Sequence, residues 1–156
     1  MHFFHNINNE KKIANINNFM QKPTNKLFLL IYMEGCNPCK ETRPEWNKIY
    51  TEFHEINDDT AIADIEQSHI SKLKFIKFEL NGFPTMKFIT NKGNTHQNFE
   101  DSNIRIKNRD ITSFIDWIKS KTHSKKNKTK THRGGKSKRH KNKKNKTKKN
   151  TSRRRR

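Results

Sequence analysis

Residues 27–46, LFLLIYMEGCNPCKETRPEW, constrain the fold more than any other part of the chain. The segment opens with seven consecutive apolar or aromatic residues, 27–33, and it contains the only two cysteines of the sequence, Cys36 and Cys39. An apolar run of this length without alternation predicts a strand that is buried on both faces, as in the centre of an α/β sheet. The break at Glu34 and Gly35 then separates this strand from the cysteine pair.

An amphipathic helix is predicted directly after the cysteines. Trp46, Ile49, Tyr50 and Phe53 are spaced i, i+3, i+4, i+7, which places them on one face of a helix. Pro44 lies inside this helix and is expected to kink it, because proline lacks the backbone N–H and crowds the preceding turn.

The order strand, turn, Cys-x-x-Cys, helix is typical of a thiol–disulfide active site. Cys36 would start the helix, where free N–H groups and the helix dipole favour a thiolate. Cys39 would lie one turn further in, and Pro38 suits the first helical turn. We therefore expect Cys36 to be the nucleophile and Cys39 the resolving residue. The alternative is a pair of structural cysteines.

Charge divides the chain into two parts. Residues 121–156 contain 19 of the 35 Lys and Arg residues and no Asp or Glu, which leaves 16 basic and 15 acidic residues in the first 120. A near-neutral segment of that size can form one hydrophobic core. We expect an N-terminal extension of uncertain order at 1–9, a folded domain at 10–120 and a disordered Lys/Arg-rich tail at 121–156, which has too little apolar surface to offset ordering entropy.

The remaining patterns predict an α/β fold with a mixed central sheet flanked by helices. The first 26 residues offer an edge strand and a short helix. Further strands are expected at 60–65, 85–90 and 95–100. A short helix capped by Ser68 is expected to end near residue 75, and Asn108 or Asp110 is expected to cap a last helix.

Several classes of protein are disfavoured. Two cysteines do not make a disulfide scaffold, and the histidines do not follow them at zinc-finger spacing, so we expect neither a metal nor another cofactor. No stretch approaches the length of a membrane span, and the first 26 residues lack the apolar core of a signal peptide. We expect an intracellular protein, cytoplasmic or nuclear.

Two motifs resemble the thioredoxin-like superfamily. Residues 31–40, IYMEGCNPCK, resemble its active-site segment, and Pro44-Glu45-Trp46 looks most like protein disulfide isomerase domains. Residues 82–88, GFPTMKF, resemble its second signature, the cis-proline loop and the following strand. The similarity covers about residues 10–120. It implies a thiol–disulfide oxidoreductase acting on protein cysteines, with the direction of the redox reaction left open.

The resemblance also implies roles for individual residues. Pro84 would be the cis-proline that faces the cysteine pair, and the backbone of Phe83 would pair with an extended substrate peptide. Pro44 matches the helix-kinking proline of the family. Arg109 matches, loosely, an arginine that helps to modulate the second cysteine; a solvated arginine is the alternative.

Three positions depart from the family pattern. Gly35 stands where the family usually has Trp, and Leu30 stands where it usually buries an Asp or Glu that shuttles the proton of the second cysteine. The lysine that often partners this acid aligns near Ile62 and is also absent. These departures put fast proton transfer at Cys39 in doubt. They motivate a second hypothesis, a weakly active or redox-inactive thioredoxin-fold binding protein tethered to nucleic acid or a virion by its tail.

The basic tail has three interpretations. Residues 121–156 have the blocked charge of an arm for nucleic acid or other polyanions. Clusters at 136–139 and 153–156 suit nuclear-localisation signals. A purely solubilising tail is the third. The Asn/Lys-rich tail also resembles in style those of proteins from large DNA viruses of algae and protists, which implies a viral protein.

Overall fold

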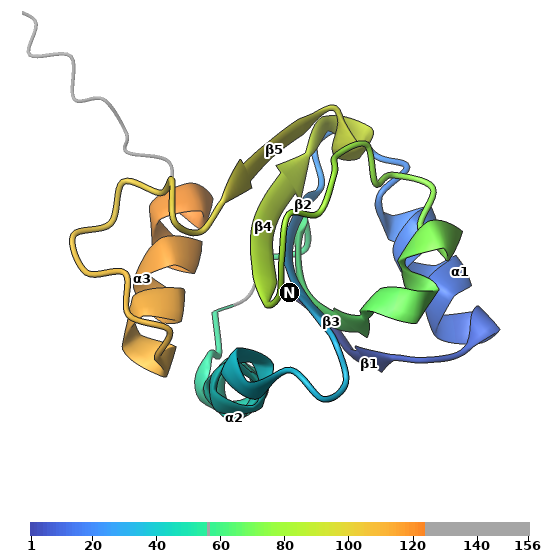
Figure 1. Cartoon of the computed structure of the whole chain (residues 1–156). Helices are drawn as coiled ribbons and strands as arrows, with labels where there is room; N and C mark the ends of the chain where they lie inside the picture. The colour runs from blue at the N-terminus through green and yellow to red at the C-terminus, as the bar shows by residue number, and fades with distance from the viewer. Residues whose placement is uncertain (56, 124–156) are drawn as a thin grey trace, which may run out of the picture. The chain divides into compact units, whose positions relative to one another are not determined.

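The computed structural model of the protein describes residues 1–55 and 57–123 (Figure 1). In this part of the chain a single five-stranded sheet has the strand order β1-β3-β2-β4-β5. The elements in chain order are β1 (His2–Ile7), α1 (Glu10–Phe19), β2 (Lys26–Tyr32), α2 (Asn37–Glu52), β3 (Thr60–Glu66), the 3-10 helix η1 (Gln67–Lys72), β4 (Thr85–Thr90), the 3-10 turn η2 (Asn91–Gly93), β5 (Thr95–Asn98) and α3 (Ile111–Thr122).

The sheet is mixed, as predicted. Strands β1 and β2 both run parallel to β3, whereas β2–β4 and β4–β5 are antiparallel pairs. The predicted strands at 27–33, 60–65, 85–90 and 95–100 are confirmed to within two residues at each end. The α/β fold class, with a mixed central sheet flanked by helices, is therefore confirmed.

Helices cover both faces of the sheet. Figure 1 shows α1 and η1 on one side of the sheet and α2 and α3 on the other. Strand β2 serves both layers, because Leu29 and Ile31 join the apolar cluster with Ile16 of α1, whereas Phe28 and Leu30 join the cluster beneath α2 and α3. This two-sided burial explains why the apolar run of β2 does not alternate with polar residues.

The N-terminal residues are part of the sheet. The sequence placed residues 1–9 in an extension of uncertain order, and the structure pairs His2–Ile7 with β3 as an edge strand. Ile7 is fully buried, and the register slips between Phe4 and Ile7, where Asn6 adopts a φ of 49°. Asn9 then caps α1 by accepting a hydrogen bond from the Lys12 N–H at 3.0 Å.

Two predicted boundaries change. The helix expected from Ser68 to residue 75 is wrong in type and length, because residues 67–72 form a 3-10 helix whose capping side chain is that of Glu66, which accepts from the Ser68 N–H at 2.7 Å. The tail was expected to begin at residue 121, but α3 continues to Thr122. The rest of the tail, 124–156, lies outside the described residues. None of the helices in residues 1–55 and 57–123 is long and apolar enough to cross a membrane.

The cap of α3 gives a first testable prediction. Asp110 accepts a hydrogen bond from the Ser113 N–H at 2.8 Å, and this contact is the main cause of its lowered pKa. Asp110→Ala should reduce the free energy of unfolding by about 1 kcal/mol, measured by urea denaturation. Because the folded-state pKa lies below the ordinary value of 3.8, the difference should be fully present at neutral pH and shrink as the pH falls below about 4.

Asp116 provides the matched control for this cap. It is an exposed aspartate within the same helix, so Asp116→Ala should leave the free energy of unfolding nearly unchanged. Equal losses for the two variants would show that the cap of α3 does not carry the effect.

Candidate active site

The two cysteines lie at the N-terminus of α2 and are joined as a disulfide. Cys36 is the N-cap residue and is partly exposed, whereas Cys39 is 1% exposed. The Cys39 N–H points at the Cys36 Sγ at 3.2 Å. The asymmetry expected from the sequence, an accessible first sulfur and a sheltered second one, is present.

Gly35 forms the turn that delivers the chain from β2 into α2. Its φ of +80° lies in the left-handed region, which glycine adopts at no steric cost. A Cβ at this position would meet no atom within 4 Å, so the space beside Cys36 is open. Where the family usually has Trp before the first cysteine, this chain has a glycine turn.

The loop before β4 lies against the cysteine pair. The Phe83–Pro84 peptide bond is cis, as the resemblance implied. The Cys36 Sγ lies 3.7 Å from the carbonyl oxygen of Phe83, which joins two segments 47 residues apart in sequence. The site is therefore made of the start of α2 and the segment that leads into β4.

Two prolines shape α2. Pro38 occupies the first turn, where its missing N–H leaves no helical hydrogen bond unmade, and the Thr42 hydroxyl donates to its carbonyl at 2.9 Å. Pro44 lies inside the helix, which nevertheless continues to Glu52. The segment between them is anchored by Cys39, which is buried, and by Thr42, which is 2% exposed.

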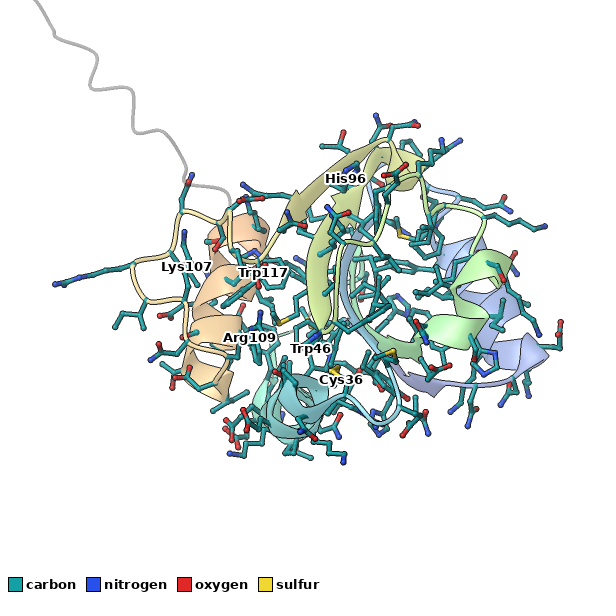
Figure 2. The ribbon with its side chains drawn as sticks, in the orientation of Figure 1. Cys36, Trp46, His96, Lys107, Arg109 and Trp117 are labelled. Atoms are coloured by element: carbon teal, nitrogen blue, oxygen red, sulfur yellow. A yellow bond between two sulfur atoms is a disulfide. The ribbon has the colours of Figure 1, made fainter. Side chains whose placement is uncertain are left out.

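Arg109 lies on the segment that leads into α3, and Figure 2 labels it together with Cys36 at the start of α2. Its Nη2 donates to Glu100 Oε1 at 3.2 Å, and its side chain is 42% exposed. Its hydrogen-bond partner is thus Glu100, and a role in modulating Cys39 stays a prediction. Arg109 also lines a surface depression together with Phe83 and Pro84.

Comparison with known proteins now assigns this arrangement to a family. A family model described as Thioredoxin matches residues 8–117. The chain belongs to the thioredoxin family. Among curated proteins it is similar to Protein disulfide-isomerase of Datisca glomerata, with 23% identity over 108 residues, covering 67% of this chain and 20% of the relative.

Protein disulfide-isomerase A4 of Mus musculus is a second relative of this thioredoxin-family chain. It is 32% identical over 76 residues, covering 49% of this chain and 12% of the relative. The solution structure of the first thioredoxin domain of the mouse protein is 23% identical, with a TM-score of 0.47, and the match covers 75% of this chain and 76% of that one. This chain therefore spans a fifth or less of the length of both curated relatives.

One carboxyl group is buried inside the sheet of this thioredoxin-family domain. The resemblance aligned the lysine that often partners the buried acid near Ile62, whereas the register of β2 and β3 sets Asp64 beside Leu30. Asp64 is 1% exposed. A buried acid is therefore present on β3, on the strand next to position 30. A lone aspartate inside the apolar strand 60–65 was the signal that sequence reasoning overlooked.

Three groups surround one oxygen of Asp64. Its Oδ1 accepts from the Asn6 N–H at 2.9 Å and from the Tyr50 hydroxyl at 2.6 Å, and the His5 Nδ1 lies 2.9 Å away. Its Oδ2 is buried and has no hydrogen-bond partner among the described residues. Burial, together with the neighbouring Asp64 charge, raises the pKa of Tyr50 well above 10.0. The contacts tie β1 and α2 to β3.

No metal centre is indicated in the part of the chain that the structure describes. Among residues 1–55 and 57–123, no group of three or more His, Cys, Asp or Glu side chains is arranged to hold a metal ion.

The Asp64 contacts predict a difference between two tyrosines. Tyr50→Phe removes a hydrogen bond to a buried carboxylate and should lower the free energy of unfolding by about 1.5–3 kcal/mol. Tyr32→Phe removes a longer bond to the neutral amide oxygen of Asn6, 3.3 Å, and should cost about 0.5–1.5 kcal/mol. Urea denaturation at pH 7 measures both. Equal losses of free energy of unfolding in the two variants would contradict a larger contribution from the hydrogen bond to Asp64.

The raised pKa of Tyr50 also sets a pH dependence. A hydroxyl whose folded-state pKa exceeds its unfolded value contributes stability that is complete below the unfolded pKa, near 10.0 for tyrosine, and is lost as the pH rises through the folded-state value. The difference in free energy of unfolding between the wild type and Tyr50→Phe should therefore become smaller as the pH rises above about 10, because the wild type loses the contribution of the hydroxyl.

Proposed function

We propose that this domain is a thiol–disulfide oxidoreductase that acts on protein cysteines through Cys36 and Cys39. The observation that carries the proposal is the asymmetric pair at the start of α2, with Cys36 partly exposed, Cys39 buried, and the Phe83 carbonyl 3.7 Å from the Cys36 Sγ. Membership of the thioredoxin family and similarity to proteins named protein disulfide-isomerase support it.

The chemistry proceeds in two exchanges. In the reducing direction, the Cys36 thiolate attacks one sulfur of a substrate disulfide; the substrate S–S bond breaks, and its other sulfur leaves as a thiolate and takes a proton. Cys39 then loses its proton and attacks Cys36 in the mixed disulfide, which forms the Cys36–Cys39 bond and releases the second substrate thiolate. The reverse sequence oxidises a substrate dithiol.

Local groups favour the reactive form of Cys36. The Cys39 N–H lies 3.2 Å from the Cys36 Sγ, and the sulfur caps a helix of sixteen residues, Asn37–Glu52, so both a hydrogen bond and the helix dipole favour a negative charge there. The open space over Gly35 leaves room for a substrate chain beside the sulfur. The backbone of Phe83 is the segment we propose to pair with an extended substrate.

Trapping tests this function. Cys39→Ala leaves the attacking thiol but removes the resolving one, so mixed disulfides with substrate proteins should accumulate through Cys36 and be visible on non-reducing gels. Cys36→Ala is the matched control, because the remaining sulfur is buried and should trap little. Wild type should reduce insulin, and both variants should lose this turnover by at least about a hundredfold, since the two sulfurs act as one unit.

The alternative is a thioredoxin-fold binding protein with weak or no redox activity, motivated by Gly35 and Leu30. A Cys36 pKa close to that of a free thiol, about 8.5, would favour it. Absence of trapped adducts together with absence of insulin reduction would overturn the enzymatic proposal.

We propose a separate role for the basic segment 121–156, binding of nucleic acid or another polyanion. Its 19 basic and no acidic residues support an interaction based on phosphate neutralisation. Deleting residues 124–156 keeps α3, which ends at Thr122, and should abolish salt-sensitive binding of a DNA duplex in a fluorescence anisotropy titration. Insulin reduction should stay unchanged. Equal DNA affinity with and without the segment would refute this role.

A further inference from the structure

A surface depression of about 320 Å³ lies beside the Phe83–Pro84 loop. Its walls include Lys87 of β4, Asn98 of β5 and the Glu100–Arg109 pair. Phe83 and Pro84 line it as well, and the Phe83 carbonyl lies 3.7 Å from the Cys36 Sγ. The depression therefore begins within one residue of the place where a substrate sulfur must bind.

Lys87 occupies an unusual position in this wall. It lies between Leu29 and Asn98 in the sheet, on the face of β4 that it shares with the buried Ile89. Only 7% of Lys87 is exposed, although apolar side chains dominate this face of the sheet. Burying an ammonium group costs free energy, and burial lowers the pKa of Lys87. A breach of the local pattern of this kind is expected at functional sites.

Among the described residues, the ammonium group of Lys87 has fewer hydrogen-bond acceptors than it has donors. It has three donors, and one goes to Asn98 Oδ1 at 2.7 Å. The ring of Phe78 lies 4.4 Å from its Nζ. Among residues 1–55 and 57–123, no carboxylate lies within 4.0 Å of this nitrogen, so no ion pair neutralises it.

Two of the three neighbouring acids have other partners, and the third, Glu79, is an exposed residue at the depression. Glu100 accepts from Arg109, and Asp101 Oδ2 accepts from the Asn98 Nδ2 at 2.8 Å. This second bond fixes the amide of Asn98 so that its oxygen faces Lys87. Lys87 thus lies next to the substrate loop without a direct ion pair, and Glu79 and Glu100 line the same depression.

We propose that this depression is a specificity subsite for an aspartate or glutamate side chain of the substrate, bound by Lys87. The inference rests on the proposed oxidoreductase function and adds a substrate class to it. An extended chain that passes Phe83 advances about 3.3 Å per residue, so an acidic residue one to three positions from the substrate cysteine reaches the depression. Its carboxylate offsets the cost of burying the lysine, and the resulting pair is shielded from water.

Activated peptides provide the test. Cys39→Ala in the full chain reacts with peptides whose single cysteine carries a thiopyridyl group; the Cys36 thiolate attacks the peptide sulfur, the Cys36–peptide disulfide forms, and thiopyridone leaves and is followed by absorbance. Peptides with Glu or Gln at each of three positions on either side of the cysteine are compared. At one or more positions Glu should react about fivefold faster than Gln at low salt, and the ratio should fall as salt rises.

Three variants locate the effect. Lys87→Met should bring the Glu/Gln ratio to one. Lys77→Met removes an exposed lysine outside the depression, which donates to Asn94, and should keep the ratio. Asn98→Asp retains Lys87 but places a carboxylate where the amide oxygen now lies, so it should also abolish the preference. The Asn98→Asp variant therefore tests the proposal even if Lys87→Met does not fold.

The outcomes separate the two proposals. Equal rates for Glu and Gln peptides at every position, with normal reaction of Cys36 toward the uncharged reagent dithiodipyridine, overturn the subsite and leave the oxidoreductase function intact. Failure to react even with dithiodipyridine overturns both. A preference for Glu that survives in both Lys87→Met and Asn98→Asp overturns the assignment to Lys87.

Discussion

The burial of β2 on both faces and along both edges is the constraint on which the rest of the structure depends. Lys26–Tyr32 is paired with β3 on one side and with β4 on the other, and its side chains pack into the apolar clusters on both faces of the sheet. A strand held in this way has no freedom of register, since a slip by one residue would exchange the two layers. Its end therefore fixes where Gly35 turns and where Cys36 starts α2. The antiparallel pairing with β4 brings the Phe83–Pro84 segment to the same edge of the sheet, so that one rigid strand positions both halves of the site.

Asp64 illustrates how a polar group is accommodated in such a core. Its Oδ1 has contacts with β1 and α2, so the N-terminal strand, which is an edge strand of the sheet, is held by polar contacts as well as by ladder hydrogen bonds. An unpaired buried carboxylate would be very costly, and the contacts offset only part of that cost, because Oδ2 keeps no partner among the described residues. The family resemblance pointed to Leu30 at the position where an acid is usually buried, and Asp64 was not considered. The structure shows a buried aspartate on β3, in register with Leu30 of β2.

The success of sequence reasoning depends on how local each signal is. The apolar run of β2, the i, i+3, i+4, i+7 face of α2 and the Gly82–Pro84 signal are read within a few residues, and the structure has them where they were expected. Position 64 needed the register between two strands, which no local pattern contains, and a shift of two residues was enough to miss it. Strand β1 was uncertain for a similar reason: its exposed, polar-rich sequence forms a strand because β3 offers an edge with which it can pair. The start of the 3-10 helix η1 was predicted wrongly because Glu66, not Ser68, supplies the capping side chain.

Asp64 and Lys87 are two buried ionisable side chains on opposite faces of one sheet, and they differ in the contacts that surround them. The Asp64 Oδ1 accepts from the Asn6 N–H of β1 and from the Tyr50 hydroxyl of α2 and lies beside the His5 Nδ1, which is the arrangement of a group that holds structure together. Lys87 has one amide oxygen and one aromatic ring as partners, and it lines a depression that Phe83 also lines. A purely structural lysine gains most when a carboxylate of its own chain pairs with it, and Glu100 lies in the same wall yet binds Arg109. The division of partners leaves Lys87 without a direct ion pair in the depression that Phe83 also lines, and this difference in partners, more than the presence of a lysine, argues for a binding role.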